Sequence, residues 1–323
     1  MPIGLGLASS HLGAINLTTA EELEHYHRNL IKNVPQPPEA ALEVPEVLEN
    51  YLSRVPPAFA ELQARIEQYD AELLIILGGD QMEMFDRSNV PNLMIYTGET
   101  AWAYNIKGTQ PRPAPGEPRR PPELKEEDLV HLKIDVETSR WLLNKLVRQA
   151  GYDVAMSDVQ EHLGPAGRGM PHAFYRPAPW LMPKLDIPVI MIYENTYDPP
   201  SLSARRCYDL GATLQEVFAN NPRRIAIYGS GGLSHDPNGY RAGWVDEELD
   251  HWFLRQIEEG NGKGTVAMYT FDSHAMRGGT GEIRSWITVA GAMEAVGHHA
   301  VTVDYLPARH AVTGIGWAYW ETN

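Results

Sequence analysis

The sequence predicts an α/β fold, a single domain in which helices flank a central and mostly buried sheet. Short all-apolar runs with the length of strands recur along the 323 residues, and they alternate with longer stretches of helical period. Several of these apolar runs also end in a Gly or Ser turn that is followed at once by a polar side chain. Alternation of this kind is typical of a sheet covered by helices.

The first third of the chain contributes strands and helices in turn. Residues 1–9 are apolar and small, and residues 71–77 (AELLIIL) suit a strand buried on both faces. Residues 92–96 (NLMIY) form a further expected strand. Helices are expected at 21–32 and at 58–69, where apolar residues recur near a period of 3.6.

A segment rich in proline and arginine, residues 107–123, interrupts this pattern and is expected to be a loop or lid. It is not a linker between domains, because the same patterning resumes after it. Beyond it, the expected elements are strands at 187–193 and 224–228 and helices at 134–149, 203–219, 244–260 and 282–293.

Composition excludes several classes of function. There are 27 Lys and Arg against 42 Asp and Glu, a net charge of −15, which argues against a nucleic-acid partner. No apolar run approaches the roughly 18 residues of a membrane span, and residues 1–13 lack the features of a signal peptide. The single cysteine, Cys207, excludes an internal disulfide. A cytoplasmic protein is expected.

Polar groups that follow strand ends are the first functional signal. They are His11 after Ser9-Ser10, Asp80-Gln81 after Gly78-Gly79, and His235 in the stretch 230–235, SGGLSH. Because ligands of open α/β sheets bind at the carboxyl ends of strands, these groups are expected to face one crevice. The alternative is that each histidine is a capping or packing residue.

Two further residues are candidates. Thr280 is expected to cap the helix that follows, which places Glu282 in its first turn, where the helix dipole favours an ionised carboxylate. Glu282 could equally be an ordinary surface residue. His172 lies between apolar stretches, and a buried neutral imidazole there can exchange a proton with a substrate oxygen.

These residues together resemble the LigB-type (class III) extradiol ring-cleavage dioxygenases, the family of the protocatechuate 4,5-dioxygenase β subunit. The resemblance covers most of the chain in order and rests on five motifs. They are ASSH (8–11), GGDQMEMFDRSNVP (78–91), PHAF (171–174) with IPVIMIYENTYDPPSLSARRCYDLG (187–211), GSGGLSHDPNGYRAGWVDEELDHWFL (229–254) and GGTGEIRSWITVAGAM (278–293).

The resemblance implies a LigB-like fold and Fe(II)-dependent opening of a catechol-type ring by O2 to a muconate semialdehyde. It implies that His11 and Glu282 are ligands of the iron, which a facial triad leaves open on one side. It implies that His235 is the acid/base residue and that His172 contacts substrate or oxygen. Expected partners are a small aromatic substrate and O2, and a homo-oligomer, a dimer, is expected.

One departure from the family pattern concerns the second imidazole ligand, because Gln81 stands where the family has histidine. Gln81 is the favoured replacement, through its amide oxygen, which is a weaker donor for Fe(II). Glu83 or His172 are the alternatives, and another divalent metal then becomes an option. The change also leaves open a metal-dependent hydrolase or decarboxylase, or a binding protein without iron.

The remaining candidates concern the substrate. A carboxylate on the aromatic ring is expected, with Arg284, Arg176 or the arginines of the proline-rich segment to neutralise it. Glu83, His274 and His310 are further candidates for substrate contact.

Overall fold

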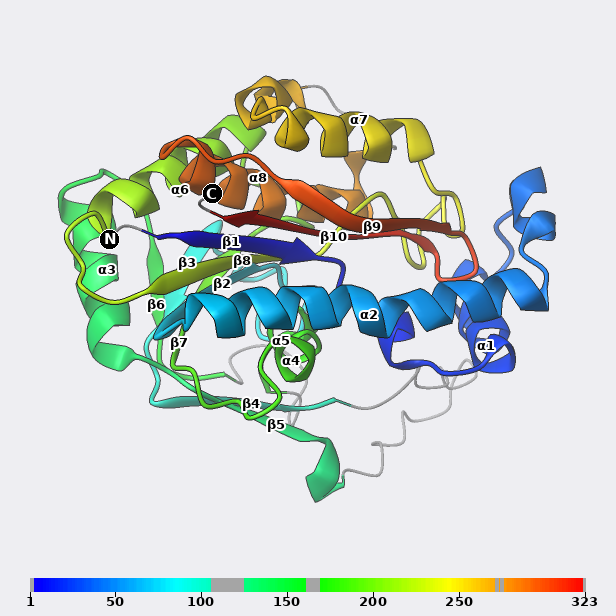
Figure 1. Ribbon diagram of the computed structural model, residues 1–323, viewed down its shortest axis with the longest axis horizontal. Helices are drawn as coiled ribbons and strands as arrows, with labels where there is room; N and C mark the ends of the chain where they lie inside the picture. Colours follow the sequence, from blue (N-terminus) through cyan, green and yellow to red (C-terminus); the bar gives the residue numbers. More distant parts are fainter. Residues whose placement is uncertain (1–2, 106–124, 161–168, 271–272, 274–275, 322–323) are drawn as a thin grey trace.

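The computed structural model describes residues 3–105, 125–160, 169–270, 273 and 276–321 (Figure 1). The proline-rich segment 107–123 and His274 lie outside the described residues. One eight-stranded sheet has the order β6-β3-β7-β2-β8-β1-β10-β9, and β4 and β5 form a separate pair. The strands are β1 (Leu5–Ser9), β2 (Leu73–Gly78), β3 (Leu93–Tyr96), β4 (Thr100–Tyr104), β5 (Leu129–Lys133), β6 (Ala155–Ser157), β7 (Val189–Glu194), β8 (Ile225–Ser230), β9 (Val301–Ala308) and β10 (Thr313–Glu321).

The predicted α/β class is confirmed, and helices cover both faces of the sheet (Figure 1). The α-helices are α1 (Ala20–Ile31), α2 (Pro45–Tyr69), α3 (Val136–Arg148), α4 (His172–Tyr175), α5 (Ala178–Leu181), α6 (Ala204–Val217), α7 (Glu247–Glu258) and α8 (Ile283–Glu294). No helix in the described part of the chain has the length and apolar character needed to cross a bilayer.

The four central strands, β7, β2, β8 and β1, are mutually parallel, whereas β10 runs antiparallel to β1 and β3 antiparallel to β7. Every residue of these central strands is buried, which explains why their sequences are apolar except at their carboxyl ends. Because the four strands are parallel, their carboxyl ends meet along one edge of the sheet. The strand side chains themselves are buried, so residues exposed at this edge come from the loops that follow the strands.

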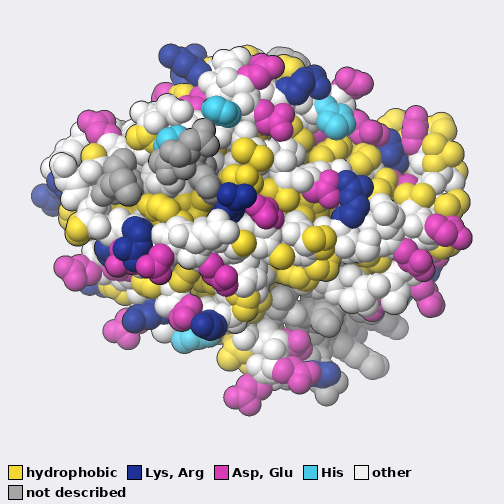
Figure 2. Space-filling model, in the orientation of Figure 1, with side chains coloured by type: hydrophobic (Ala, Val, Ile, Leu, Met, Phe, Trp, Pro, Cys, Tyr) yellow, Lys and Arg dark blue, Asp and Glu magenta, His cyan; other side chains and the backbone are white. Residues whose placement is uncertain are grey.

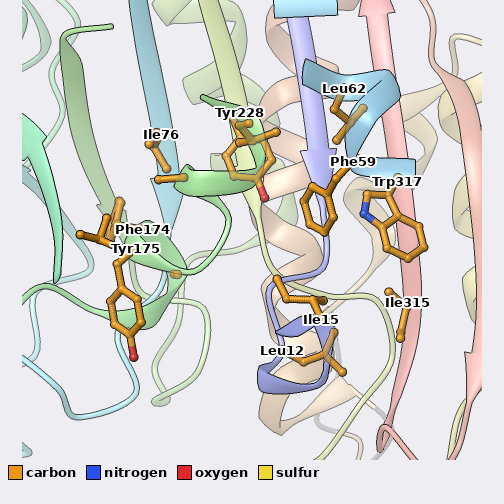
Figure 3. Close-up of a cluster of buried hydrophobic side chains, with 14 of the residues drawn as sticks. Leu12, Ile15, Phe59, Leu62, Ile76, Phe174, Tyr175, Tyr228, Ile315 and Trp317 are labelled. Carbon is orange, nitrogen blue, oxygen red and sulfur yellow. The ribbon is translucent and has the colours of Figure 1, made fainter. Parts of the chain in front are cut away.

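Alternate strand residues supply two separate cores, as the pleat requires. Leu74 and Ile76 of β2 pack with residues of α1, α2, α4 and α5, while Leu73 and Ile75 pack with α3, α6, α7 and α8. In the first core, Phe59 of α2 meets Trp317 of β10 edge to face at 5.7 Å, and Tyr228 of β8 lies beside them (Figure 3).

Acidic and basic side chains are interspersed over the face drawn in Figure 2.

The Thr280 prediction is wrong. Residues Gly278–Glu282 form a 3₁₀ turn, and α8 begins only at Ile283. Thr280 instead exchanges hydrogen bonds with the backbone of His235: its hydroxyl accepts from the His235 N–H at 3.0 Å, and its N–H donates to the His235 carbonyl at 2.9 Å. The threonine therefore ties two distant segments together and does not cap a helix.

Candidate metal and proton-transfer site

The site lies where the parallel strands β1, β2 and β8 end. His11 follows β1, Gln81 follows β2 and His235 follows β8, and these strands are neighbours in the sheet. Glu282 reaches the same place from the turn before α8. The structure thus brings together His11, Gln81, His235 and Glu282, at the edge where ligands of such sheets bind.

One carboxylate oxygen, Oε2 of Glu282, is the centre of the contacts. The Nε2 atoms of His11 and His235 each lie 3.4 Å from it, and the Gly232 N–H donates to it at 3.0 Å. Glu282 is only 1% exposed. Burial raises the pKa of its carboxyl, but the positive charge of the His11 and His235 imidazoles in their protonated form outweighs burial and holds that pKa below its ordinary value. Glu282 is therefore an anion.

Glycine is required at position 231 beside this carboxylate. Gly231 has φ of +123°, and a Cβ atom there would stand 2.7 Å from the Cβ and Oε2 of Glu282. The Gly-Gly turn after β8 consequently allows the backbone to pass directly over the carboxylate.

Hydrogen bonds on the far side of each imidazole determine its tautomer. Ser230 donates its hydroxyl proton to the Ala173 carbonyl at 2.5 Å, so its oxygen accepts from Nδ1–H of His11 at 2.9 Å. The Nδ1 of His235 lies 2.8 Å from the Leu233 carbonyl, which can only accept. In neutral imidazoles both Nε2 atoms then carry lone pairs.

With both imidazoles neutral, three lone-pair atoms converge here without a proton between them. The Nε2 of His11 is buried and has no hydrogen-bond partner in the described part of the chain. Like the Nε2 of His235, it faces an anionic oxygen. Such an arrangement is unfavourable in a buried site unless a cation lies among these atoms, either a metal ion or a proton on one imidazole. The described residues include no group of three or more His, Cys, Asp or Glu side chains already laid out as a metal site. The fit to a metal rests on the donor atoms themselves, two imidazole nitrogens and a carboxylate oxygen.

Gln81 contacts the other oxygen of Glu282. Its Nε2 donates to Oε1 at 2.7 Å, because an amide that meets a carboxylate must present its NH₂ group. The turn that positions Gln81 is held by Asp80, whose carboxylate accepts from the N–H groups of Glu83, Met84 and Phe85 at 2.9, 2.9 and 3.0 Å. Burial raises the pKa of Asp80 to about 6.

His172 and Glu83 form a second pair next to this group. Oε2 of Glu83 accepts from Nδ1 of His172 at 2.7 Å and from its backbone N–H at 2.8 Å. The His172 ring stands edge-on to that of His11, with centroids 4.7 Å apart. Burial lowers the pKa of His172 to about 4, against the opposing effect of Glu83, so the imidazole is neutral near pH 7. Glu83 is directed to His172 and not to Glu282.

The two candidate arginines differ in their surroundings. The buried guanidinium of Arg284 donates to the carbonyls of Leu202, Thr196 and Gly281, and it stacks 3.6 Å above the Tyr269 ring. Those contacts hold the guanidinium through Nε and Nη1.

Arg176 is half-buried, one helical turn after His172 and on the same helix face. No carboxylate of a described residue lies within ion-pair distance of it. Burial raises the pKa of the nearby Tyr26, and the charge of Arg176 opposes this rise. Among the described residues, Arg176 is therefore a cation without a carboxylate partner, and it stands on the same side of the helix as His172.

His310 belongs to a different cluster. Its Nδ1 lies 2.8 Å from Oε2 of Glu43, and its ring stacks on that of His27 at 4.3 Å. No contact among the described residues joins His310 to Glu282 or His11.

Sequence reasoning missed the residues that hold the site from behind. Ser230 and Thr280 stand inside motifs that were noted, but their partners lie far away in sequence. Asp250 also lies inside a quoted motif, 229–254: from α7 its carboxylate accepts from the Ser234 N–H at 2.9 Å and from the Ser234 hydroxyl at 2.8 Å, next to His235.

Comparison with known proteins identifies the family. Residues 42–314 match the family described as the catalytic LigB subunit of aromatic ring-opening dioxygenase. A 2,3-dihydroxyphenylpropionate/2,3-dihydroxicinnamic acid 1,2-dioxygenase of Mycolicibacterium paratuberculosis is 24% identical over 319 residues, covering 84% of this chain and 93% of that protein.

Gallate dioxygenase of Pseudomonas putida is 28% identical over 159 residues, covering 47% of this chain and 45% of its own length. Among solved structures, the uncharacterized protein JW3007 of Escherichia coli K12 matches with a TM-score of 0.47 at 12% identity, covering 98% of this chain and 99% of that one. With the family matched over most of its length, the chain belongs to the LigB family of extradiol, aromatic ring-opening dioxygenases.

Proposed function

We propose that this protein is an Fe(II)-dependent extradiol dioxygenase that opens the ring of a catechol bearing a carboxylate. The observation that supports it most directly is that the Nε2 atoms of His11 and His235 both face the Oε2 atom of Glu282. A cation among these three atoms would stabilise the arrangement. In a family of ring-opening dioxygenases that cation is Fe(II), which when bound would bring the two diol oxygens and O2 together and let electrons pass between them.

His11 and Glu282 would hold the metal in this proposal. Ser230 holds the Nδ1–H of His11, so its Nε2 is free to bind a cation. Gln81 and the Gly232 N–H hold the Glu282 carboxylate from either side. Both groups are thus oriented before any metal or substrate arrives.

His172 is the supported carrier of the substrate proton. It is neutral near pH 7, and Glu83 binds its Nδ1–H, so its Nε2 can take a proton from a catechol hydroxyl and return it later. The negative charge of Glu83 would stabilise the imidazolium that forms. The family resemblance gives a similar role to His235, whose Nε2 here faces Glu282.

A carboxylated substrate is supported by two independent points. Dihydroxyphenylpropionate and gallate, which name the relatives, both carry a carboxylate. Arg176 offers a half-buried guanidinium on the helix face of His172, where it could bind that group.

Oxygen consumption tests the proposal. The protein is loaded anaerobically with Fe(II) and mixed with 3-(2,3-dihydroxyphenyl)propionate, gallate, 3,4-dihydroxybenzoate or catechol in an oxygen electrode. We expect one O2 consumed per ring opened, a coloured ring-opened product, and no turnover by His11→Ala. Turnover without O2 would mean a hydrolase or decarboxylase, and binding without turnover would mean a binding protein; either would overturn the proposal.

The quaternary state is a separate prediction. We expect a homodimer, which sedimentation velocity measures directly.

A further inference from the structure

His235 and His11 stand in equivalent positions around Glu282. Each presents a lone pair on Nε2, each is fixed through Nδ1, and each lies 3.4 Å from the same oxygen. Ligand atoms bound to one ion at about 2.1 Å, with angles between about 90° and 110°, are separated by about 3.0–3.4 Å. The two observed separations match that spacing.

We infer that His235, and not Gln81, supplies the second imidazole of the metal site, together with His11 and Glu282. The resulting set of two histidines and one carboxylate is the combination that suits non-heme Fe(II). This inference rests on the proposed function, since it concerns the same ion. It reassigns His235 from proton carrier to ligand and leaves proton transfer to His172.

The surroundings of His235 are those of a fixed ligand. Its backbone N–H and carbonyl are both bonded to Thr280, which lies two residues before Glu282. The neighbouring Ser234 is bound by the buried Asp250. A Cβ atom at Gly279 would stand 2.0 Å from Nε2 of His235, so the imidazole occupies space that only glycine leaves open. The histidine and the carboxylate are therefore held relative to each other.

Gln81 has a different role in this arrangement. Its NH₂ group is committed to Oε1 of Glu282 at 2.7 Å, which turns the carboxylate so that Oε2 faces both imidazoles. Gln81 is thus a positioning residue that acts through Glu282. His235, from the loop after β8, replaces the imidazole that the family has at position 81.

The experiment counts imidazoles on the metal. Wild type, Gln81→Ala, His235→Ala, His235→Gln and His172→Phe are loaded anaerobically with Fe(II), and pulsed EPR of the nitrosyl adduct counts coordinated imidazole rings. Fe(II) affinity is measured by competition with a chelator, and circular dichroism verifies folding. Activity plays no part in either readout.

We expect two imidazoles in wild type, in Gln81→Ala and in His172→Phe, and one in both His235 variants. The affinity should fall by more than about 100-fold without His235 and by only about 10–100-fold without Gln81, because residues that act through a ligand contribute about 10–100-fold. Two imidazoles in folded His235→Gln, or a larger loss in Gln81→Ala than in the His235 variants, would refute the inference while leaving the dioxygenase proposal intact. Absence of Fe(II) binding by wild type would instead remove the proposed function itself.

Discussion

Single hydroxyl groups decide the chemistry of the imidazoles in this site. The Ser230 hydroxyl has one proton, and because the Ala173 carbonyl takes it, His11 must donate through Nδ1. The sequence does not show that Ser230 fixes the tautomer of His11, because Ala173, which accepts the Ser230 proton, lies 57 residues away. Residue-level effects of this kind yield the first two predictions.

Replacement of His172 tests its role as proton carrier. His172→Phe should keep its metal and slow ring opening by about 100-fold or more, the usual share of general acid–base catalysis. Glu83→Gln should slow it less, since the hydrogen bond survives and only the charge is lost. The measurement is kcat at saturating substrate and O2, with the exposed His251→Phe as control. An unchanged kcat in His172→Phe would contradict the assignment.

Replacement of Arg176 tests recognition of the substrate carboxylate. Arg176→Gln should raise KM for 3,4-dihydroxybenzoate by about 10–100-fold, because hydrogen bonds to charged groups contribute about 1.5–3 kcal/mol. KM for catechol, which has no carboxylate, should stay the same. Arg206, which lies over the Tyr152 ring, provides the matched control Arg206→Gln. An equal rise for both substrates would count against this role.

At the scale of elements, the contact between α6 and α8 depends on two glycines. A Cβ atom at Gly211 would stand 1.9 Å from the Thr288 carbonyl oxygen, and one at Gly291 would stand 2.1 Å from that of Tyr208. Both contacts would be with backbone oxygen atoms, which cannot move away by a side-chain rotation. The two helices are thus as close as their backbones allow, and α8 follows directly on Glu282.

Gly291→Ala should therefore destabilise the protein. In an exposed helix this change stabilises by up to about 1 kcal/mol, but overpacking here should cost about 1–3 kcal/mol. The free energy of unfolding in urea measures the effect, with Glu216→Ala on the exposed side of α6 as control. A more stable Gly291→Ala would show that α6 and α8 can separate freely.

Strand β7 ends in a buried carboxyl group that responds to pH. Glu194 accepts from the Thr288 hydroxyl at 2.6 Å, and burial raises its pKa to about 7 against the opposing effect of the Thr288 and Ser285 hydroxyls. Because the folded pKa lies above the unfolded value of 4.5, the stability contributed by the neutral form is complete below about pH 4.5. It is lost as the pH rises through about 7.

Glu194→Gln should remove this dependence. Between pH 5 and pH 8 the wild type should lose more free energy of unfolding than the variant, by on the order of 3 kcal/mol. Urea unfolding at both pH values measures the difference, and the exposed Glu49→Gln should behave as wild type. Parallel curves for wild type and Glu194→Gln would mean that Glu194 is ionised in the folded protein.

At the scale of the whole molecule, the site joins segments from both ends of the chain. His11, His235 and Glu282 meet only in the folded state, so a metal that binds there stabilises the fold by about 2.7 kcal/mol at a hundred times its Kd. Removal of metal by a chelator should lower Tm by several degrees, and Fe(II) or Co(II) should restore it. His11→Ala should show no metal-dependent change, and an equal shift in that variant would place the ion elsewhere.

The extent of prediction from sequence also differs along the chain. The buried parallel strands were predicted to within about two residues at most of their ends, because strands covered on both faces are almost continuously apolar. The start of α2 was missed, since Pro56-Pro57 lies within it and proline usually interrupts a helix. The edge strand β9 and its neighbour β10 were missed as well, because their sequence does not alternate cleanly and antiparallel pairing depends on distant partners.

The sequence by itself determined the α/β class, the family, and the polar residues that end the central strands, because each depends on local pattern and order along the chain. Only the tertiary structure decided which oxygen of Glu282 faces the imidazoles, that Gln81 donates to this carboxylate, and that Glu83 belongs to His172. Those relations join residues up to 271 positions apart in sequence, such as His11 and Glu282. Hydrogen-bond direction and burial, which set tautomers and charges, exist only once such residues are in contact.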